Sequence, residues 1–340
     1  IKVISSWDNY APTPLIKLNK LNDELKFKNI YYKDEDKRFE LKSFKALGGA
    51  FAVYKIASEK KNITVSTATA GNHGRSVAWG AQRLGLKCKI FISEFVSESR
   101  AEAMRNLDAE VIRVKGNYDN SLKECIEQSN KNNWEIVQDV SWEGYKEVPK
   151  LIMAGYTIMV KEIIDEINKN SITHVFLQAG VGGMAAAMIA GFAKLSENIP
   201  QFIIIEPENA DCVFQSIKNN KPTTVDIKKE TVMGGMSCGD VSSIAWEILK
   251  NSANYCLTIP DEAISTAVAL LAEKRLSNEK IIGGECAVPG VIALIGSFNN
   301  KEYLDKLKLN SESNVLLFGC EGLTDDAMYQ KLLNDGLQKI

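Results

Sequence analysis

The chain has very little histidine and no clustered cysteine. Its 340 residues include only two histidines, His73 and His174, and seven cysteines of which none form a C-x-x-C pair. A zinc site of cysteine and histidine needs short ligand spacings, and disulfide frameworks belong mainly to small secreted chains. We therefore expect no metal site, and we expect a reducing compartment, the cytoplasm.

Acidic and basic residues are nearly balanced, and long apolar runs are missing. Lys and Arg number 41 against 43 for Asp and Glu, so the formal net charge is -2. Nucleic-acid binding usually needs a basic excess, and a membrane helix needs roughly 18 apolar residues in a row. Residues 1–15 also lack the basic and apolar segments of a secretory signal. We expect a small-molecule partner, and neither nucleic acid nor membrane.

Short apolar runs alternate with longer amphipathic runs along the chain. The apolar runs are mostly continuous, as in strands with both faces covered, and the amphipathic runs have helical spacing. This order predicts an α/β fold in which mainly parallel sheets are flanked by helices, and the length predicts two domains. The expected strands are 63–66, 89–92, 111–114, 136–138, 174–178, 202–206 and 314–318, and the expected helices include 74–84, 99–106, 121–130, 156–167 and 261–273.

Lys45 lies in the segment SFKALGG, at the predicted start of a helix and among small and apolar residues. An amine in such a crowded place is poorly hydrated, which lowers its pKa and makes it a nucleophile toward an aldehyde. The alternative is an ordinary surface lysine. Taken alone, the segment favours that alternative.

A second segment, TATAGNHGR, joins a predicted strand to a predicted helix. Its small residues let the backbone approach a ligand, the helix N-terminus favours an anion, and Asn72 offers a neutral donor. The alternative is a plain turn before a capped helix. We interpret His73 as structural, because the chain has no G-x-S-x-G elbow that would support a serine nucleophile.

A third segment, QAGVGGM, closes the predicted strand 174–178. Successive N–H groups at a glycine turn before a helix form a nest that suits a phosphate. A dinucleotide fingerprint would need a third glycine where Ala185 stands. Tight packing of the strand against the helix is an equally weighted alternative. The candidate phosphate ligands are Gly180, Val181, Gly182, Gly183 and Met184.

Two further segments follow predicted strands. Cys320 ends the last strand, and the carboxyl ends of parallel strands face the ligand crevice of an α/β fold. The loop QDVSWEGY carries Asp139 and Glu143, which are candidate acid–base groups. The alternatives are a small core residue for Cys320 and helix caps for the two acids.

Taken together, these segments resemble the fold-type II, or tryptophan-synthase-β-like, family of pyridoxal-phosphate (PLP) enzymes, and within it the diaminopropionate ammonia-lyases. The similarity runs from about residue 12 to residue 329. The strings that carry it are RFELKSFKALGGAF, TATAGNHGRSVAW, QDVSWEGY, THVFLQAGVGGM, EPENADC, MSCGD, WEIL and CEG.

The resemblance implies a role for each segment. Lys45 would bind PLP as a Schiff base, Asn72 would contact the cofactor's 3′-oxygen, the glycine segment would hold its phosphate, and Cys320 would lie beside its ring nitrogen. Diaminopropionate ammonia-lyases have an aspartate where this chain has Ala70. That aspartate is associated with proton abstraction on one face of the substrate, so Ala70 predicts a single base, Lys45, and a preference for one enantiomer.

The resemblance further implies a lyase that performs α,β-elimination. It would act on a 2-amino acid with a β leaving group, such as 2,3-diaminopropionate, and release a 2-oxo acid and ammonia, with Asp139 or Glu143 protonating the leaving group. A hydroxyamino-acid dehydratase, a racemase or a PLP-binding protein without turnover stays an alternative. We expect a homodimer whose larger domain comprises residues 1–64 and 146–340 and whose smaller domain is the insertion 65–145.

Overall fold

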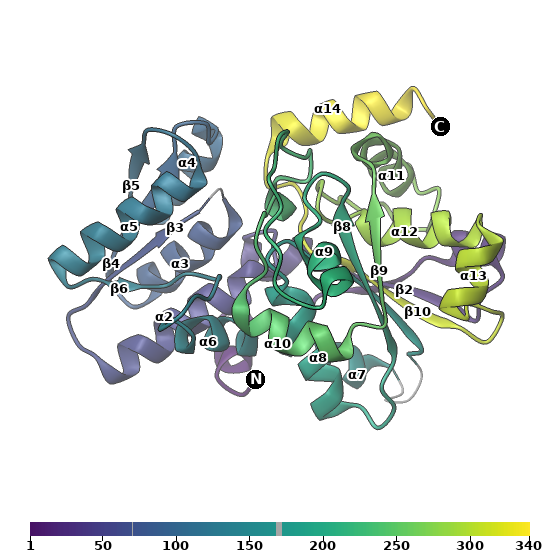
Figure 1. The fold of residues 1–340 in the computed structure, drawn as a ribbon, viewed down its shortest axis with the longest axis horizontal. Coiled ribbons are helices and arrows are strands. Elements are labelled where there is room, and N and C mark those ends of the chain that lie inside the picture. The colour runs from purple at the N-terminus through teal and green to yellow at the C-terminus, as the bar shows by residue number, and fades with distance from the viewer. Residues whose placement is uncertain (70, 168–171) are drawn as a thin grey trace. The chain divides into compact units, whose positions relative to one another are not determined.

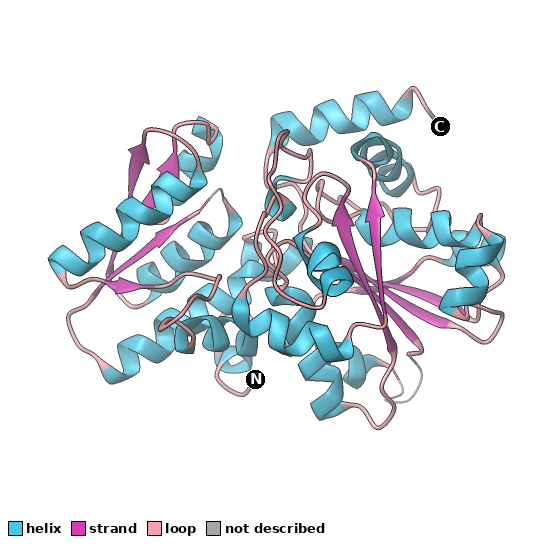
Figure 2. Cartoon of the chain, viewed as in Figure 1, coloured by secondary structure: helices cyan, strands magenta, loops and turns pink. Residues whose placement is uncertain are grey.

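The computed structural model describes residues 1–69, 71–167 and 172–340 (Figure 1). Its backbone divides into two compact units. The first unit comprises Ile1–Tyr10 and Ser43–Ile158, and the second comprises Ala11–Lys42 and Met159–Ile340. Both are α/β layers of the kind that the alternating pattern predicts (Figure 2). The expected fold class is thereby confirmed.

The first unit is built on a four-stranded parallel sheet with the order β5-β4-β3-β6. Helix α5 packs on β3 and β4, and helix α2 packs on α3 and α6. Its elements are η1 (Ile4–Ser6), α2 (Lys45–Glu59), β3 (Thr64–Ala68), α3 (Asn72–Arg83), β4 (Lys87–Ser93), α4 (Glu98–Arg105), β5 (Ala109–Val114), α5 (Tyr118–Asn132), β6 (Glu135–Ile136) and α6 (Glu147–Tyr156).

The second unit is built on a six-stranded sheet with the order β1-β2-β10-β7-β8-β9, in which only β1 runs antiparallel to its neighbour. Its strands are β1 (Leu15–Lys17), β2 (Asn29–Asp34), β7 (His174–Gln178), β8 (Gln201–Pro207), β9 (Tyr255–Ile259) and β10 (Asn314–Gly319). Its helices are α1 (Asn19–Leu25), η2 (Glu35–Glu40), α7 (Ile158–Glu166, whose first residue belongs to the first unit), α8 (Gly183–Leu195), α9 (Cys212–Asn219), η3 (Gly234–Met236), α10 (Ser243–Ser252), η4 (Asp261–Ala263), α11 (Ile264–Ala272), α12 (Pro289–Phe298), α13 (Lys301–Leu307) and α14 (Asp326–Leu337).

The units divide the chain at residues other than those expected from the sequence. The expected smaller domain, 65–145, lacks helices α2 and α6, which the structure assigns to the first unit. The reason is close helix packing. A Cβ atom on Gly48 of α2 would lie 2.4 Å from Cε1 of Tyr156 at the end of α6, so these helices meet where only glycine fits. Lys45 therefore belongs to the first unit and not to the larger part of the chain.

Strand β2 shows how the fold hides polar residues in its core. Lys33 is fully buried, and its Nζ atom lies 2.6 Å from the carbonyl oxygen of Thr13 and 2.7 Å from Oε2 of Glu162. Arg38 is also buried and bonds to Glu162 and Glu35. Two buried cations thus meet two buried carboxylates, which compensates the charges that burial would otherwise penalise.

Candidate active site

Lys45 opens helix α2 of the first unit with its side chain about one-quarter exposed. Its ammonium group forms an ion pair with Oδ2 of Asp139. The rings of Phe44 and Tyr156 lie 5.5 and 6.0 Å from its Nζ atom, and these rings contact each other edge to face. The amine is thus held between one carboxylate and two aromatic rings that limit its contact with water.

The small residues after Lys45 have a packing reason. A Cβ atom on Gly49 would lie 2.5 Å from Oγ of Ser76 on helix α3. Ser76 donates from this hydroxyl to the carbonyl oxygen of Lys45 at 2.5 Å and accepts from the N–H of Ala50 at 3.1 Å. The glycines therefore let α3 approach closely enough to fix the backbone that carries the amine.

Asp139 is positioned by its neighbour Gln138. The Gln138 side chain accepts from the hydroxyl of Thr67 and the N–H of Ala68, and donates to the carbonyl of Ala68 and the hydroxyl of Tyr118. Three of these hydrogen bonds tie this segment to the end of β3, and the fourth ties it to the start of α5.

The stretch WEGY adds a clamp on the same segment. The hydroxyl of Tyr145 donates to the carbonyl of Ile136 at 2.8 Å and accepts from the N–H of Gln138 at 2.9 Å. The Tyr145 ring stacks on Trp142 with centroids 4.1 Å apart. Glu143 lies exposed in the turn between these rings, and its role as an acid stays a prediction.

The charges around Asp139 decide its protonation. Burial alone would raise the pKa of this carboxyl, but its electrostatic interactions with His73 and Lys45 and the hydrogen bond from Lys45 hold that pKa below its usual range. Burial lowers the pKa of His73, so at neutral pH the imidazole is neutral and Lys45 is the cation that keeps Asp139 ionised. Asp139 is a carboxylate near pH 7.

The loop before helix α3 leads into Asn72 and His73, the first two residues of the helix. The hydroxyl of Thr69 accepts from the N–H groups of Gly71 and Gly74, which shapes the turn into the helix. Asn72 is the first residue of α3 and is partly exposed. Ala70 lies outside the described residues. His73 is buried within 3.7 Å of Asp139, a juxtaposition that the sequence gives no means to predict.

In the second unit, the glycine segment joins β7 to α8. Gly182 has φ of +87°, a conformation that side chains disfavour, and its N–H neighbours stand at the N-terminus of α8. A Cβ atom there would lie 2.8 Å from Cδ1 of Leu249, and one on Gly180 would lie 3.0 Å from Sγ of Cys238. The backbone that leads into helix α8 therefore has no side chain at Gly180 and Gly182. This would suit the binding of a phosphate, and it also suits tight packing.

Cys320 follows β10 directly and is buried. Its thiol donates to the carbonyl oxygen of Cys286 at 3.0 Å, and Nε2 of Gln178 donates to the same carbonyl at 3.0 Å. The thiol and the glycine segment thus both lie at the carboxyl ends of strands of one parallel sheet, where ligands of α/β folds bind.

Comparison with known proteins decides the family. The model of the pyridoxal-phosphate dependent enzyme family matches residues 7–320. The chain belongs to this family. A diaminopropionate ammonia-lyase of Escherichia coli (strain K12) is 34% identical over 351 residues, which cover 96% of this chain and 88% of that protein. A catabolic L-threonine dehydratase of Staphylococcus aureus (strain USA300) is 26% identical, over 93% of this chain and 88% of that one.

A solved structure agrees with this family. It is the crystal structure of Escherichia coli diaminopropionate ammonia-lyase in complex with an aminoacrylate–PLP azomethine reaction intermediate. Its TM-score to this chain is 0.90 at 34% identity, and the match covers 97% of this chain and 89% of that one. The expected membership of the fold-type II PLP enzymes, and with it the expected cofactor, is confirmed.

Among the described residues, one group of side chains has the spacing of a metal site. Ligand atoms of Glu285, Cys286 and Glu321 lie within 4.8 Å of one another, and all three residues are buried. The N–H of Cys286 already donates to Oε1 of Glu321 at 3.0 Å. The sequence offers no signal for this group because its members come from distant segments. The expected absence of a metal site stays a prediction.

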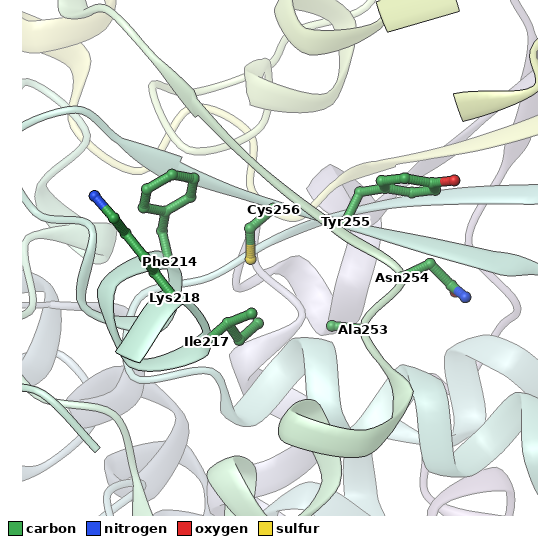
Figure 3. Close-up of a pocket in the computed structure, with 7 residues that line it drawn as sticks. All are labelled: Phe214, Ile217, Lys218, Ala253, Asn254, Tyr255 and Cys256. Carbon is green, nitrogen blue, oxygen red and sulfur yellow. The ribbon is translucent and has the colours of Figure 1, made fainter. Parts of the chain in front are cut away.

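The second unit has a surface hollow whose lining residues are separated in the sequence from the predicted site residues. It has a volume of about 300 Å³ and is lined by residues of α9 and of the chain entering β9 (Figure 3). In Figure 3, Tyr255 and Cys256 point in different directions, as successive strand residues do. None of the residues that we predict to bind the cofactor lines this hollow. No helix in the described ranges is long and apolar enough to cross a membrane.

Proposed function

We propose that this chain is a PLP-dependent lyase that performs α,β-elimination on 2,3-diaminopropionate or a related 2-amino acid, releasing a 2-oxo acid and ammonia. The observation that carries the proposal is the arrangement of Lys45. Lys45 opens a helix, and its amine lies near two aromatic rings and contacts one carboxylate. In a chain of this family, similar over nearly its whole length to diaminopropionate ammonia-lyases, that arrangement suits a base at the substrate's Cα.

The residues present fit the cofactor. The bare backbone at Gly182, at the start of a 13-residue helix, suits a phosphate, which backbone N–H groups and the helix dipole stabilise. The Cys320 thiol offers a ring nitrogen a neutral partner in place of a carboxylate. When bound, PLP draws electrons from Cα of an amino acid, so that the Cα proton becomes removable.

In the proposed reaction, the residues of the site have different tasks. Lys45 first holds the cofactor through its amine and then, released, removes the Cα proton as a general base. Asn72 would contact the 3′-oxygen of the cofactor, and the segment 180–184 would bind its phosphate, so that the cofactor is held in a fixed position. Asp139, which contacts the amine of Lys45, is our candidate for managing the proton of the leaving group.

The test has two stages. Purified protein is expected to be yellow, and borohydride is expected to fix the cofactor on Lys45, as peptide mass analysis will show. Amino acids with β-amino, β-hydroxy and β-thio groups are then screened for 2-oxo acid and ammonia. The proposal is refuted if the protein is colourless and stays unlabelled after incubation with PLP and borohydride. Faster turnover of β-hydroxy than of β-amino substrates would make the enzyme a dehydratase.

We also propose that the protein is a homodimer in the cytoplasm. Support for the dimer comes from the family, and support for the compartment comes from scattered cysteines without C-x-x-C pairs. Light scattering of the purified holoenzyme tests the dimer, and fractionation of cells tests the compartment. A monomer at micromolar concentration, or protein found outside the cytoplasm, would overturn the respective proposal.

A further inference from the structure

A buried nitrogen of the first unit lies beside the Lys45–Asp139 ion pair without a hydrogen-bond partner. It is Nδ1 of His73, whose side chain is 5% exposed, and it stands 3.7 Å from Oδ2 of Asp139. Buried polar atoms normally have partners, so an exception needs a physical explanation. Here the exception stands next to the carboxylate that contacts the predicted base.

The other nitrogen of the ring determines where the protons are. Nε2 of His73 lies 2.8 Å from the carbonyl oxygen of Val137, which can only accept, so Nε2 carries a hydrogen. Nδ1 then carries a proton only when the ring is charged. A neutral ring turns its lone pair toward the Asp139 carboxylate, whereas a charged ring donates toward it. Nδ1 of the ring can therefore bind one additional proton, on the side that faces Asp139.

The charge of Lys45 controls whether that place is filled. Burial lowers the pKa of His73, the Asp139 carboxylate opposes this, and the Lys45 cation adds to it. While Lys45 is an ammonium, it compensates Asp139 and the imidazole stays neutral. Once Lys45 no longer offers an ammonium, Asp139 is a buried anion with His73 as its neighbour, and a buried anion without a partner is costly.

We propose that His73 and Asp139 form a proton relay, which takes up the proton of Lys45 when its ammonium charge is lost and delivers that proton to the leaving β-amino group. This inference rests on the proposed function. In the part of the chain that the structure describes, two other titratable groups face the pair. They are the phenols of Tyr145 and Tyr156, whose pKa values are raised by burial, so both stay neutral. The relay therefore carries one proton, which is bound either by His73 or by Asp139.

The proton balance closes over the elimination. The Lys45 proton moves to Asp139 and on to Nδ1 of His73. The neutral amine of Lys45 then removes the Cα proton, and the electron pair left at Cα forms the bond to Cβ while the Cβ–N bond breaks. The leaving nitrogen keeps the electron pair of the broken Cβ–N bond, accepts the stored proton through Asp139 and departs as ammonia. No oxidant or reductant is needed.

The first test reads the proton directly. The chain has only two histidines, so nitrogen NMR of histidine-labelled protein gives two rings to follow, with His174 as an internal control in the second unit. In the wild type without added cofactor, His73 is expected neutral at pH 7 with its hydrogen on Nε2. In Lys45→Met, its titration midpoint is expected to rise by roughly one pH unit or more, because the opposing cation is gone.

The outcome of this titration decides the relay without reference to turnover. In the double variant Lys45→Met, Asp139→Asn the rise is expected to disappear, whereas the midpoint of His174 stays unchanged in all variants. An unchanged His73 midpoint in Lys45→Met overturns the proposal. So does a rise that persists without the Asp139 carboxylate.

The second test uses the leaving group. His73→Gln keeps an amide N–H for the carbonyl of Val137 and removes the titrating nitrogen. With 2,3-diaminopropionate, kcat is expected to fall about 100-fold or more, the usual contribution of general acid catalysis. With β-chloroalanine it is expected to fall less than about threefold, since chloride leaves without a proton. Equal losses would make His73 merely structural. No turnover of either substrate by the wild type would refute the proposed function, and the NMR titration would still judge the relay.

Discussion

Substituting Gly182 by alanine separates cofactor binding from folding. Gly182 has φ of +87°, and a Cβ atom there would lie 2.8 Å from Cδ1 of Leu249 and 3.2 Å from Cβ of Ala245. The left-handed conformation costs a non-glycine residue about 1–2 kcal/mol. Ordinary carbon contacts begin near 3.5 Å, so the segment or the Leu249 side chain must also shift by roughly 0.5 Å or more. Gly182→Ala is therefore expected to lose about 1–2 kcal/mol in the free energy of unfolding.

The same shift is expected to weaken PLP binding further. Hydrogen bonds to a charged group contribute about 1.5–3 kcal/mol each, and a displaced N–H lengthens its bond to the phosphate. Loss of one such bond raises the Kd for PLP about 10- to 100-fold. Unfolding in urea gives the stability, and titration of the cofactor-free protein with PLP, followed by absorbance, gives the Kd.

A matched control is Gly296→Ala in helix α12. A Cβ atom on Gly296 would meet nothing within 4 Å, and its φ is not positive. This variant is expected to gain about 0.5–1 kcal/mol in stability and to bind PLP like the wild type. The assignment of the segment 180–184 to the phosphate is refuted if Gly182→Ala loses stability but keeps the wild-type Kd, because tight packing would then explain the glycines.

Three further predictions follow from other residues. Ala70→Asp is expected to add turnover of the D substrate to an enzyme that otherwise prefers the L form, and equal turnover of both forms by the wild type would contradict the single-base hypothesis. Tyr145→Phe removes one donor and one acceptor around Gln138, and is expected to cost about 1–3 kcal/mol in urea unfolding and to lower kcat. Burial raises the pKa of Glu206 to about 8 from its ordinary 4.5, so its stability contribution is full below pH 4.5 and is lost as pH rises through 8. Glu206→Gln is therefore expected to flatten the decline in unfolding free energy across this range, and an unchanged decline would assign it to other groups.

Strand β2 illustrates what the sequence conceals about the fold. All seven strands expected from continuous apolar runs are present, with ends displaced by a few residues. Strands β1, β2 and β9 are not predicted by such runs. In β2 the segment NIYYKD is mostly buried although it ends in Lys33 and Asp34. Glu162 from elsewhere in the second unit pairs with Lys33, and burial raises the pKa of Asp34 to about 6. Compensation of this kind depends on distant residues, so no local pattern reveals it.

The extent of the first unit has a similar explanation. Helix α2 carries Lys45, and the sequence alone suggests no reason to join it to the segments after residue 64. The structure joins them through Gly48 and Gly49, where neighbouring helices come too close for a side chain. A glycine in a sequence indicates only that a side chain is missing. The helix that packs against it is known only from the tertiary structure.

What the sequence by itself determined is the chemistry available: a lysine at a helix start, a glycine segment after a strand, a late cysteine and the family to which the chain belongs. These features are local, because periodicity, glycine content and motif order are properties of neighbouring residues. Only the tertiary structure decided that Asp139 pairs with Lys45 and that His73 stands behind Asp139. Those three residues are brought together by α2, α3 and the segment after β6. The energy of a buried charge depends on such through-space neighbours rather than on sequence order.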